Sequence, residues 1–123
     1  MEAAVQVHLE GGPQAASEAR ALIRERLAGR VEESTLDDMQ LLVSEVVTNG
    51  IRHGDGDIDL EVLLNDSRAL VRCVDTGPGF DPGNPEPHED GSGGYGLMLV
   101  DRLAQRWGVR RDHVCCVWFE LAT

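Results

Sequence analysis

The chain has 123 residues, 41% of them hydrophobic, and its 22 acidic against 11 basic side chains give a formal net charge of −11. This length predicts one globular domain over residues 1–123 with a single core, and the acidic excess argues against direct binding to nucleic acid or to an anionic membrane surface. No apolar run approaches the roughly 20 residues of a membrane span, and residues 1–10 lack the pattern of a signal peptide, so we expect a cytoplasmic protein.

The first part of the chain predicts a strand followed by two helices. Apolar residues alternate with polar ones over 4–9, which favours a strand with one face exposed to water. Apolar residues then recur at helical spacing over 13–27, and Gly29 is placed to stop this helix. Ser34 or Thr35 can cap a second helix, because their hydroxyls accept hydrogen bonds from the free N–H groups of a first turn.

The second helix is expected to run to His53 and is the stretch around which the chain is organised. Its last turns carry Glu45, Asn49 and His53 at four-residue steps, which return to nearly the same face with about 40° of drift and about 6 Å of rise. An apolar stripe lies beside this line, so the polar side chains are expected at the rim of a buried face; a solvated helix edge is the alternative. A helix-interior glycine costs roughly 0.5 to 1 kcal/mol relative to alanine, so Gly50 indicates close approach of another element or a ligand.

The remaining residues predict two β-hairpins separated by a long loop and a third helix. The loop over 76–96 is rich in Gly, Pro, Asp and Glu, and a loop of this length in a small domain is usually a functional lid or a disordered segment. The order of elements is typical of an α+β two-layer sandwich, with a mainly antiparallel mixed sheet and about three helices on one face. The expected elements are strands over 58–64 and 70–74, a helix from 97 to about 106, and strands over 107–111 and 114–121.

The three cysteines, Cys73, Cys115 and Cys116, have no metal-ligand spacing. Cys73 and one of the adjacent pair fall within strand-like apolar runs. We interpret all three as buried or strand thiols, with a reactive thiol as the alternative.

The first of three motifs is Asp-x-Gly-x-Gly at Asp75, Gly77 and Gly79, directly after a predicted strand. A carboxylate there can accept a hydrogen bond from the exocyclic amine of adenine, and the two glycines let the backbone turn tightly against a flat ring. Guanine presents a carbonyl oxygen at that position, so Asp75 would also select the base. Taken alone, the same residues are good turn chemistry and nothing more.

The second motif is the glycine cluster over 91–96, GSGGYG, which leads into the third predicted helix. Closely spaced glycines leave backbone N–H groups accessible, and a helix N-terminus adds unsatisfied donors and the positive end of a dipole. Such a segment suits a phosphate group. A flexible linker is the alternative.

The third motif is the Glu45 and Asn49 pair. Mg²⁺ takes oxygen ligands and tends to keep several waters and substrate phosphate oxygens, so the Asn49 carboxamide oxygen can supply one protein ligand. Glu45, one turn earlier, can take a proton from an attacking hydroxyl or water. We interpret His53 as a structural residue at the helix end rather than a catalytic one.

In this order the three motifs resemble the ATP-binding fold shared by gyrase, histidine kinases and MutL, known as GHKL. The small size and the lack of a dimerisation helix with a phosphoacceptor histidine look like the anti-sigma-factor serine/threonine kinase branch (SpoIIAB/RsbW-like), and residues 96–109 look like its actinobacterial stand-alone regulators. The resemblance covers about 14–121. It implies an ATP pocket between sheet and lid, a bound Mg²⁺, phosphorylation of a serine on an anti-anti-sigma partner, and sequestration of a sigma factor, often by a homodimer.

The resemblance also implies roles for individual residues. Glu45 would be the catalytic base, Asn49 the Mg²⁺ ligand and Asp75 the adenine contact, while Gly50 stands where this branch more often has alanine. The residues implied to bind the nucleotide are Asn49, Asp75, Gly77, Gly79, Gly93, Gly94, Tyr95, Gly96 and Leu97.

The predicted function is that of an ATP-binding serine/threonine protein kinase acting as an anti-sigma factor. Residues 76–96 contain no Lys or Arg, so phosphate charge would be met by Mg²⁺, by backbone N–H groups, and by Arg52 or Arg102 from outside the lid. Two alternatives stay open. One is a protein-sequestering regulator without transfer activity, and the other is a simple ATPase in which water replaces serine.

Overall fold

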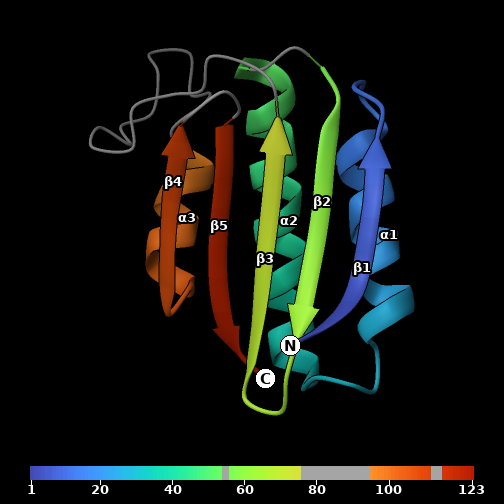
Figure 1. The fold of residues 1–123 in the computed structure, drawn as a ribbon, viewed down its shortest axis with the longest axis vertical. Coiled ribbons are helices and arrows are strands. Elements are labelled where there is room, and N and C mark those ends of the chain that lie inside the picture. The colour runs from blue at the N-terminus through green and yellow to red at the C-terminus, as the bar shows by residue number, and fades with distance from the viewer. Residues whose placement is uncertain (54–55, 76–94, 112–114) are drawn as a thin grey trace.

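The structure is a computed structural model that describes residues 1–53, 56–75, 95–111 and 115–123. Within these ranges a five-stranded sheet carries three helices on one face, as Figure 1 shows. All neighbouring strands pair antiparallel in the order β1-β2-β3-β5-β4. The predicted α+β two-layer fold is therefore confirmed. The elements are β1 (Glu2–Leu9), α1 (Ala15–Leu27), α2 (Glu33–His53), β2 (Ile58–Leu64), β3 (Arg68–Asp75), α3 (Tyr95–Leu103), β4 (Arg106–Arg111) and β5 (Cys115–Ala122).

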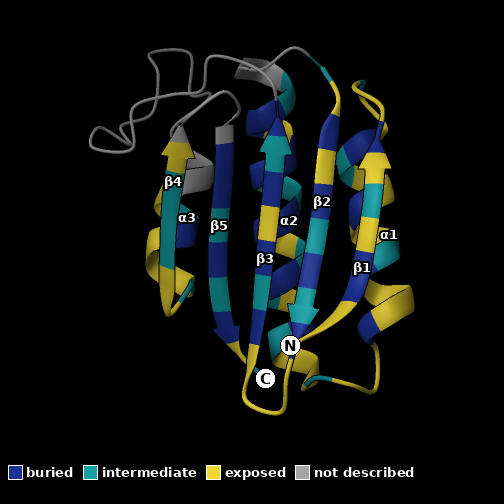
Figure 2. Ribbon diagram, viewed as in Figure 1, coloured by how far each residue is buried: buried dark blue, intermediate teal, exposed yellow. Residues whose placement is uncertain are grey.

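The pleat of the sheet decides which side chains meet the helices. Successive side chains of a strand point to opposite faces, and β2 and β3 bury every second residue, an alternation visible in Figure 2. Asp75 has the same parity as Val71 and Cys73, so its side chain lies on the helix side at the end of an otherwise apolar row. This buried row comprises Ile58, Leu60, Val62 and Leu64 of β2, Ala69, Val71, Cys73 and Asp75 of β3, and Val117, Phe119 and Leu121 of β5.

The helix α2 lies along the middle of the sheet and forms the centre of the helical layer (Figure 1). A polar seam joins it to α1: Arg20 donates a hydrogen bond to Ser44 Oγ at 2.6 Å, and Gln40 Nε2 donates to the Arg20 carbonyl oxygen at 3.0 Å. Across the described ranges, none of the three helices has the length and apolar composition of a membrane span. The buried apolar residues of α2 are Leu36, Met39, Leu42, Val43, Val46 and Val47.

The start of α2 differs from the prediction. The first helical hydrogen bond runs from Leu36 N–H to the carbonyl oxygen of Glu32 at 2.9 Å, so Ser34 and Thr35 lie inside the first turn and the predicted cap at either residue is wrong. Thr35 Oγ1 donates instead to the carbonyl oxygen of Ala122 at 3.1 Å. The hydroxyl is satisfied by the end of β5, a contact that the local sequence does not reveal.

The third helix is also shorter than predicted. It ends at Leu103 rather than near Arg106, because the Gln105 N–H donates to the carbonyl oxygen of Glu120 at 2.9 Å and the chain enters the sheet there. In contrast, the predicted stop at Gly29 after α1 is confirmed. Gly29 has a φ of 83°, a left-handed conformation that favours glycine.

His8 on β1 connects this strand to the start of β2. The contact lies at the end of the sheet that is next to the C-terminus of α2. Its Nδ1 lies 2.7 Å from Asp59 Oδ1 and its Nε2 lies 3.0 Å from Asp57 Oδ2, so both nitrogens donate only when the imidazole is protonated. Asp57 also accepts a hydrogen bond from the Gly11 N–H at 3.1 Å. These bonds raise the pKa of His8, through Asp59 first and then Asp57, and lower the pKa of Asp57, through Gly11 first and then His8.

Replacing His8 by glutamine is expected to remove a pH-dependent part of the stability. Because the pKa of His8 is raised in the folded protein, its contribution is fully present below the ordinary value of about 6.5 and is lost as the pH rises through the folded pKa. Asp57 has the opposite dependence, since its pKa is lowered and its contribution is lost as the pH falls through the folded value.

The measurement is the urea midpoint of the parent and of His8→Gln. We expect the parent to exceed the variant by more near about pH 6 than near about pH 9, by a small amount because the His8 side chain is 57% exposed. Gln6→Ala, on the same exposed face of β1, is the control and should show a pH-independent difference. A His8→Gln difference that does not change with pH would contradict the assignment.

Candidate functional site

Two polar residues are buried where the C-terminal part of α2 meets the end of β3. Asn49 is 5% exposed and Asp75 is 4% exposed, and they are the polar or charged residues that count as buried in the described part of the chain. A buried carboxylate and a buried carboxamide at one otherwise apolar interface mark a candidate binding site. Both residues were singled out from the sequence motifs.

Gly50, the residue after Asn49 on α2, lies close to Asp75. A Cβ atom on Gly50 would lie 3.4 Å from Asp75 Oδ2 and 2.6 Å from Ile58 Cδ1. Asp75 and Ile58 are direct partners in the β2-β3 ladder. The carboxylate of Asp75 therefore lies against the helical turn that carries Asn49, and the close approach inferred from a glycine inside the helix is confirmed.

Asn49 presents an unmet hydrogen-bonding group. Its Nδ2 is fully buried and has no hydrogen-bond partner among the described residues, which costs on the order of 1 to 3 kcal/mol for a buried donor. A half-turn of the amide exchanges the donor and the carbonyl oxygen. The same position can therefore meet a phosphate oxygen through Nδ2 or a cation through Oδ1.

These residues fit Mg²⁺ as a partly hydrated ion. In the described ranges, no group of three or more His, Cys, Asp or Glu residues gathers to hold a metal. The chain would thus supply few ligands, with Asn49 as one of them, and Mg²⁺ commonly completes its octahedron with water and substrate phosphate oxygens. A single carboxamide oxygen at a buried rim is compatible with such a site.

Glu45 lies one helical turn before Asn49 on α2. It is half-buried, and its carboxylate makes no hydrogen bond or ion pair with another described residue. Its neighbours on the helix differ, because Ser44 accepts a bond from Arg20 and Thr48 Oγ1 donates to the Ser44 carbonyl oxygen at 2.8 Å. Glu45 is therefore available to accept a proton.

The glycine motifs are described only in part. Gly77, Gly79, Gly93 and Gly94 lie outside the described residues. Tyr95, Gly96 and Leu97 form the first turn of α3, so this helix begins where the glycine cluster predicted a helix N-terminus, and Val100 anchors it in the core. The side chains of His53, Tyr95 and Leu97 fall outside what the structure describes. Sequence reasoning missed Ile58, whose contact with Gly50 becomes visible only once β2 is paired with β3.

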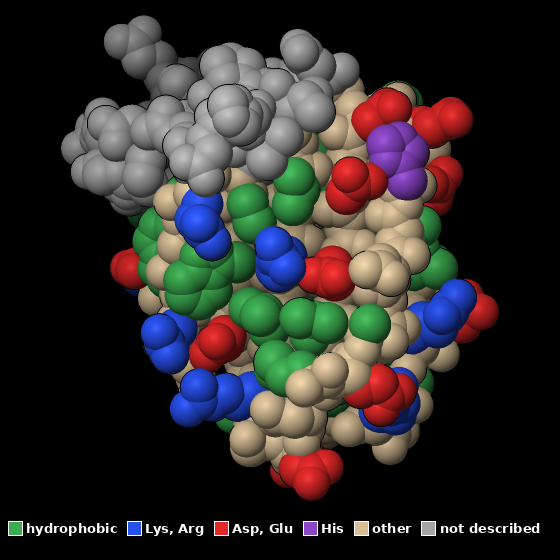
Figure 3. Space-filling view, viewed as in Figure 1, with side chains coloured by type: hydrophobic (Ala, Val, Ile, Leu, Met, Phe, Trp, Pro, Cys, Tyr) green, Lys and Arg blue, Asp and Glu red, His purple; other side chains and the backbone are tan. Residues whose placement is uncertain are grey.

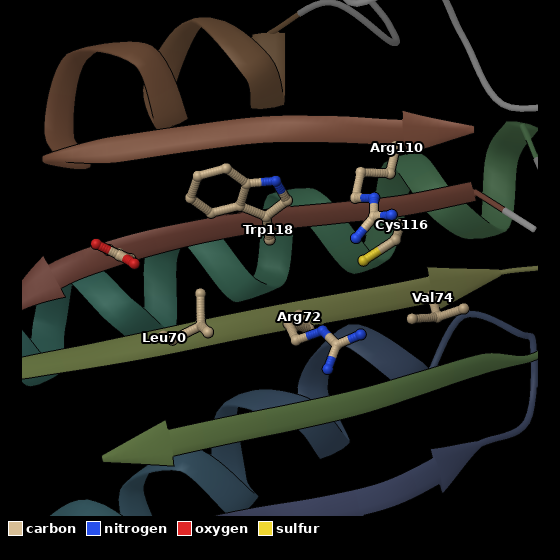
Figure 4. A pocket seen from close by; sticks show the side chains of 7 residues that line it. Leu70, Arg72, Val74, Arg110, Cys116 and Trp118 are labelled. Carbon is tan, nitrogen blue, oxygen red and sulfur yellow. The ribbon is translucent and has the colours of Figure 1, made fainter. Parts of the chain in front are cut away.

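A hollow of about 670 Å³ lies on the helix-free face of the sheet (Figures 3 and 4). It contains none of the residues of the three motifs. Arg72 projects onto this face and forms an ion pair with Glu61 at 3.1 Å. The indole of Trp118 lies against Gly108, which has no side chain to obstruct it: a Cβ atom on Gly108 would lie 2.8 Å from Trp118 Nε1. The contacts described on this side of the sheet are apolar packing and an ion pair. Its lining residues are Leu70, Arg72, Val74, Arg110, Cys116, Trp118 and Glu120.

The cysteines match their interpretation as far as they are described. Cys73 and Cys116 are buried within strands β3 and β5. The side chain of Cys115 is outside the described set, although its backbone opposite Asp75 is paired in the β3-β5 ladder.

Comparison with known proteins agrees with this geometry. Residues 9–120 match the model of the histidine kinase-like ATPase domain. The chain belongs to this family. Similar proteins include the serine-protein kinase RsbW of Listeria monocytogenes serotype 4a (strain HCC23), 32% identical over 84 residues that cover 55% of this chain and 54% of the relative. RsbW of serovar 1/2a (strain EGD-e) is 31% identical over 84 residues, with the same coverage.

These matches confirm the resemblance to RsbW-type kinases at modest identity. This ATPase-family chain spans about half the length of the curated relatives it matches. The shared family accounts for the fold, whereas the residues that act in this chain are argued from its own geometry.

Asn49→Ala is expected to leave the ligand-free protein nearly as stable as the parent, or more stable. The substitution removes a buried donor without a described partner, so the free energy of unfolding should stay within about 1 kcal/mol of the parent. Val47→Ala, a fully buried control two residues earlier, should lower it by roughly 1 to 3 kcal/mol through lost packing. Urea unfolding without nucleotide measures both; an equal loss in the two variants would make Asn49 a structural residue.

Proposed function

We propose that this chain is an ATP-binding serine/threonine protein kinase that acts as an anti-sigma factor. The observation that carries the proposal is the burial of Asn49 and of Asp75, whose carboxylate lies against the turn of α2 that carries Asn49, in a chain of the histidine kinase-like ATPase family. The similarity to RsbW serine-protein kinases supports the choice of reaction.

Asp75 would recognise adenine. Its carboxylate accepts hydrogen bonds only, so it pairs with the exocyclic amine of adenine and opposes the carbonyl oxygen of guanine. Its position at the end of β3 and against α2 holds this acceptor on rigid elements, which favours a defined geometry over a loop-borne contact.

Asn49 would hold Mg²⁺, which supplies charge neutralisation to the phosphates when it is bound. The N-terminus of α3 offers free N–H groups and the positive end of a dipole to the same phosphates. We propose that Gly77, Gly79, Gly93, Gly94 and Gly96, with Tyr95 and Leu97, shape the nucleotide pocket, and that the lid covers it over 76–96. Because the lid contains no Lys or Arg, Arg52 or Arg102 would contribute any side-chain charge.

Glu45 would act as the general base. The target serine loses its proton to the Glu45 carboxylate while its oxygen forms a bond to the γ-phosphorus, and the bond from that phosphorus to the β,γ-bridging oxygen breaks to release ADP. Positioning and charge stabilisation contribute most of the rate enhancement in such transfers. A carboxylate without a described partner, one turn from the Mg²⁺ ligand, suits this role.

The partners we propose are a sigma factor, which the protein would sequester, and an anti-anti-sigma protein that carries the phosphorylated serine. A homodimer and a cytoplasmic location complete the proposal. All of these follow from the resemblance to the anti-sigma kinase branch. A sequestering regulator without transfer and a simple ATPase remain the two alternatives.

Asp75→Asn is expected to weaken Mg²⁺-ATP binding by about 10-fold to 100-fold, because it replaces a charged acceptor by an amide that also presents donors. Isothermal titration of the parent should show binding of ATP, dependence on Mg²⁺ and no comparable binding of GTP. Asp66→Asn, in the turn at the opposite end of the β2-β3 hairpin, should bind ATP like the parent. If the well-folded parent protein binds no ATP, the proposal of a nucleotide site is wrong.

Glu45→Gln is expected to retain ATP binding while lowering phosphate transfer by about 10²-fold to 10⁴-fold, the usual contribution of a general base. The assay follows labelled γ-phosphate from ATP to anti-anti-sigma proteins of the source genome, tested one at a time. Asp38→Asn, a half-buried acid two turns earlier on α2, is the control and should transfer normally.

The same assay separates the alternatives. Phosphate release without a protein acceptor, abolished by Glu45→Gln, would identify a simple ATPase. Partner binding by a parent protein that never transfers phosphate would identify a sequestering regulator and refute the kinase.

A further inference from the structure

Gly50 lies at a close contact between α2 and the sheet near the site. It is buried within α2, directly after Asn49. A Cβ atom there would lie 2.6 Å from Ile58 Cδ1, far inside the 3.5 to 4.0 Å at which two carbon atoms attract each other best. With Ile58 in its present position, a side chain at residue 50 would therefore require either Ile58 or α2 to shift.

Ile58 has little freedom to make room. Its side chain is fully buried in the core, and it faces Asp75 directly in the antiparallel ladder, where paired Cβ atoms lie about 4.5 to 5.5 Å apart. A methyl group on residue 50 would therefore press Ile58 toward its neighbours or lift α2 away from the sheet. Lifting α2 would move the turn that carries Asn49 away from the Asp75 carboxylate.

We propose that Gly50 is a positioning residue of the nucleotide site: its missing side chain sets how closely the Asp75 carboxylate lies against the Asn49 turn. The inference rests on the proposed function for its link to ATP, but the geometry stands by itself. Glycine weakens a helix relative to alanine, so the position is unfavourable for α2 alone and is explained by the close approach. The geometry of the site thus favours glycine at residue 50, whereas the stability of the helix favours alanine.

The test compares Gly50→Ala, Ile58→Val and the double variant. Ile58→Val removes Cδ1, and the next atom of Ile58, Cγ1, lies 3.8 Å from the added Cβ, an ordinary contact. We expect Gly50→Ala to weaken Mg²⁺-ATP binding by at least about tenfold, and the double variant to bind within about threefold of Ile58→Val. Thr48→Ala, an exposed change on the same turn of α2, should leave binding unchanged.

A second measurement needs no nucleotide. The side-chain amide signals of Asn49 and the carboxyl carbon signal of Asp75, followed by NMR in the free protein, should shift in Gly50→Ala and return toward the parent values in the double variant. Urea midpoints show that each variant is folded.

Each outcome is informative. Gly50→Ala protein that binds ATP like the parent, or a double variant as weak as Gly50→Ala, would overturn the positioning role. Unchanged NMR signals in Gly50→Ala would overturn it as well. If the parent binds no ATP while the NMR signals shift and recover as expected, the proposed function fails and the positioning of Asp75 by Gly50 stands.

Discussion

The packing of α2 against the β2-β3 pair is the contact on which the candidate site depends. The packing is close where Gly50 meets Ile58 and the Asp75 carboxylate, and it is continued toward the helix start by a row of buried apolar residues. Because core packing is dense and changes little on the time average, the two polar side chains of the interface are held by a helix and a strand rather than by loops. Such support is what a binding site with a defined geometry needs.

Two features of the same interface lower the stability of the protein without a ligand. The Asn49 Nδ2 is buried without a described partner, and Gly50 weakens the helix that carries it. The unmet Asn49 donor is explained if a ligand completes the site, and Gly50 is explained by its close approach to Ile58 and Asp75. A ligand that binds only the folded state would in turn stabilise the fold through mass action, which couples occupancy of the site to the stability of the sheet and helix layer.

The distribution of positive charge fits a site that relies on a cation and on backbone donors. Several described arginines pair with carboxylates away from Asn49 and Asp75: Arg24 with Glu33 and Asp37, Arg30 with Glu2, Arg68 with Glu120, and Arg72 with Glu61. Arg110 lines the hollow on the helix-free face together with Arg72 (Figure 4). In a chain of net charge −11, the proposed triphosphate binding would depend strongly on Mg²⁺ and on the N-terminus of α3.

The sequence by itself determined the kinds of element and most of the candidate residues, because these depend on local periodicity and on chemical type. Alternation at period two predicted the strands, helical spacing predicted the helices, and the cost of a helix-interior glycine marked Gly50. The motifs singled out Asn49 and Asp75 before their burial was known. The predicted element boundaries are wrong where residues form long-range hydrogen bonds, as Thr35 does with Ala122 and Gln105 with Glu120.

Only the tertiary structure decided which residues meet. The contact of Gly50 with Ile58 and Asp75 requires the register of β2 on β3 and the position of α2 across them, and the His8 link to Asp57 and Asp59 requires the register of β1 on β2. These contacts join different helices and strands, so no periodic pattern within one element contains them. They arise because the sheet and the helical layer bury one shared apolar surface, and a single register aligns every buried row at once.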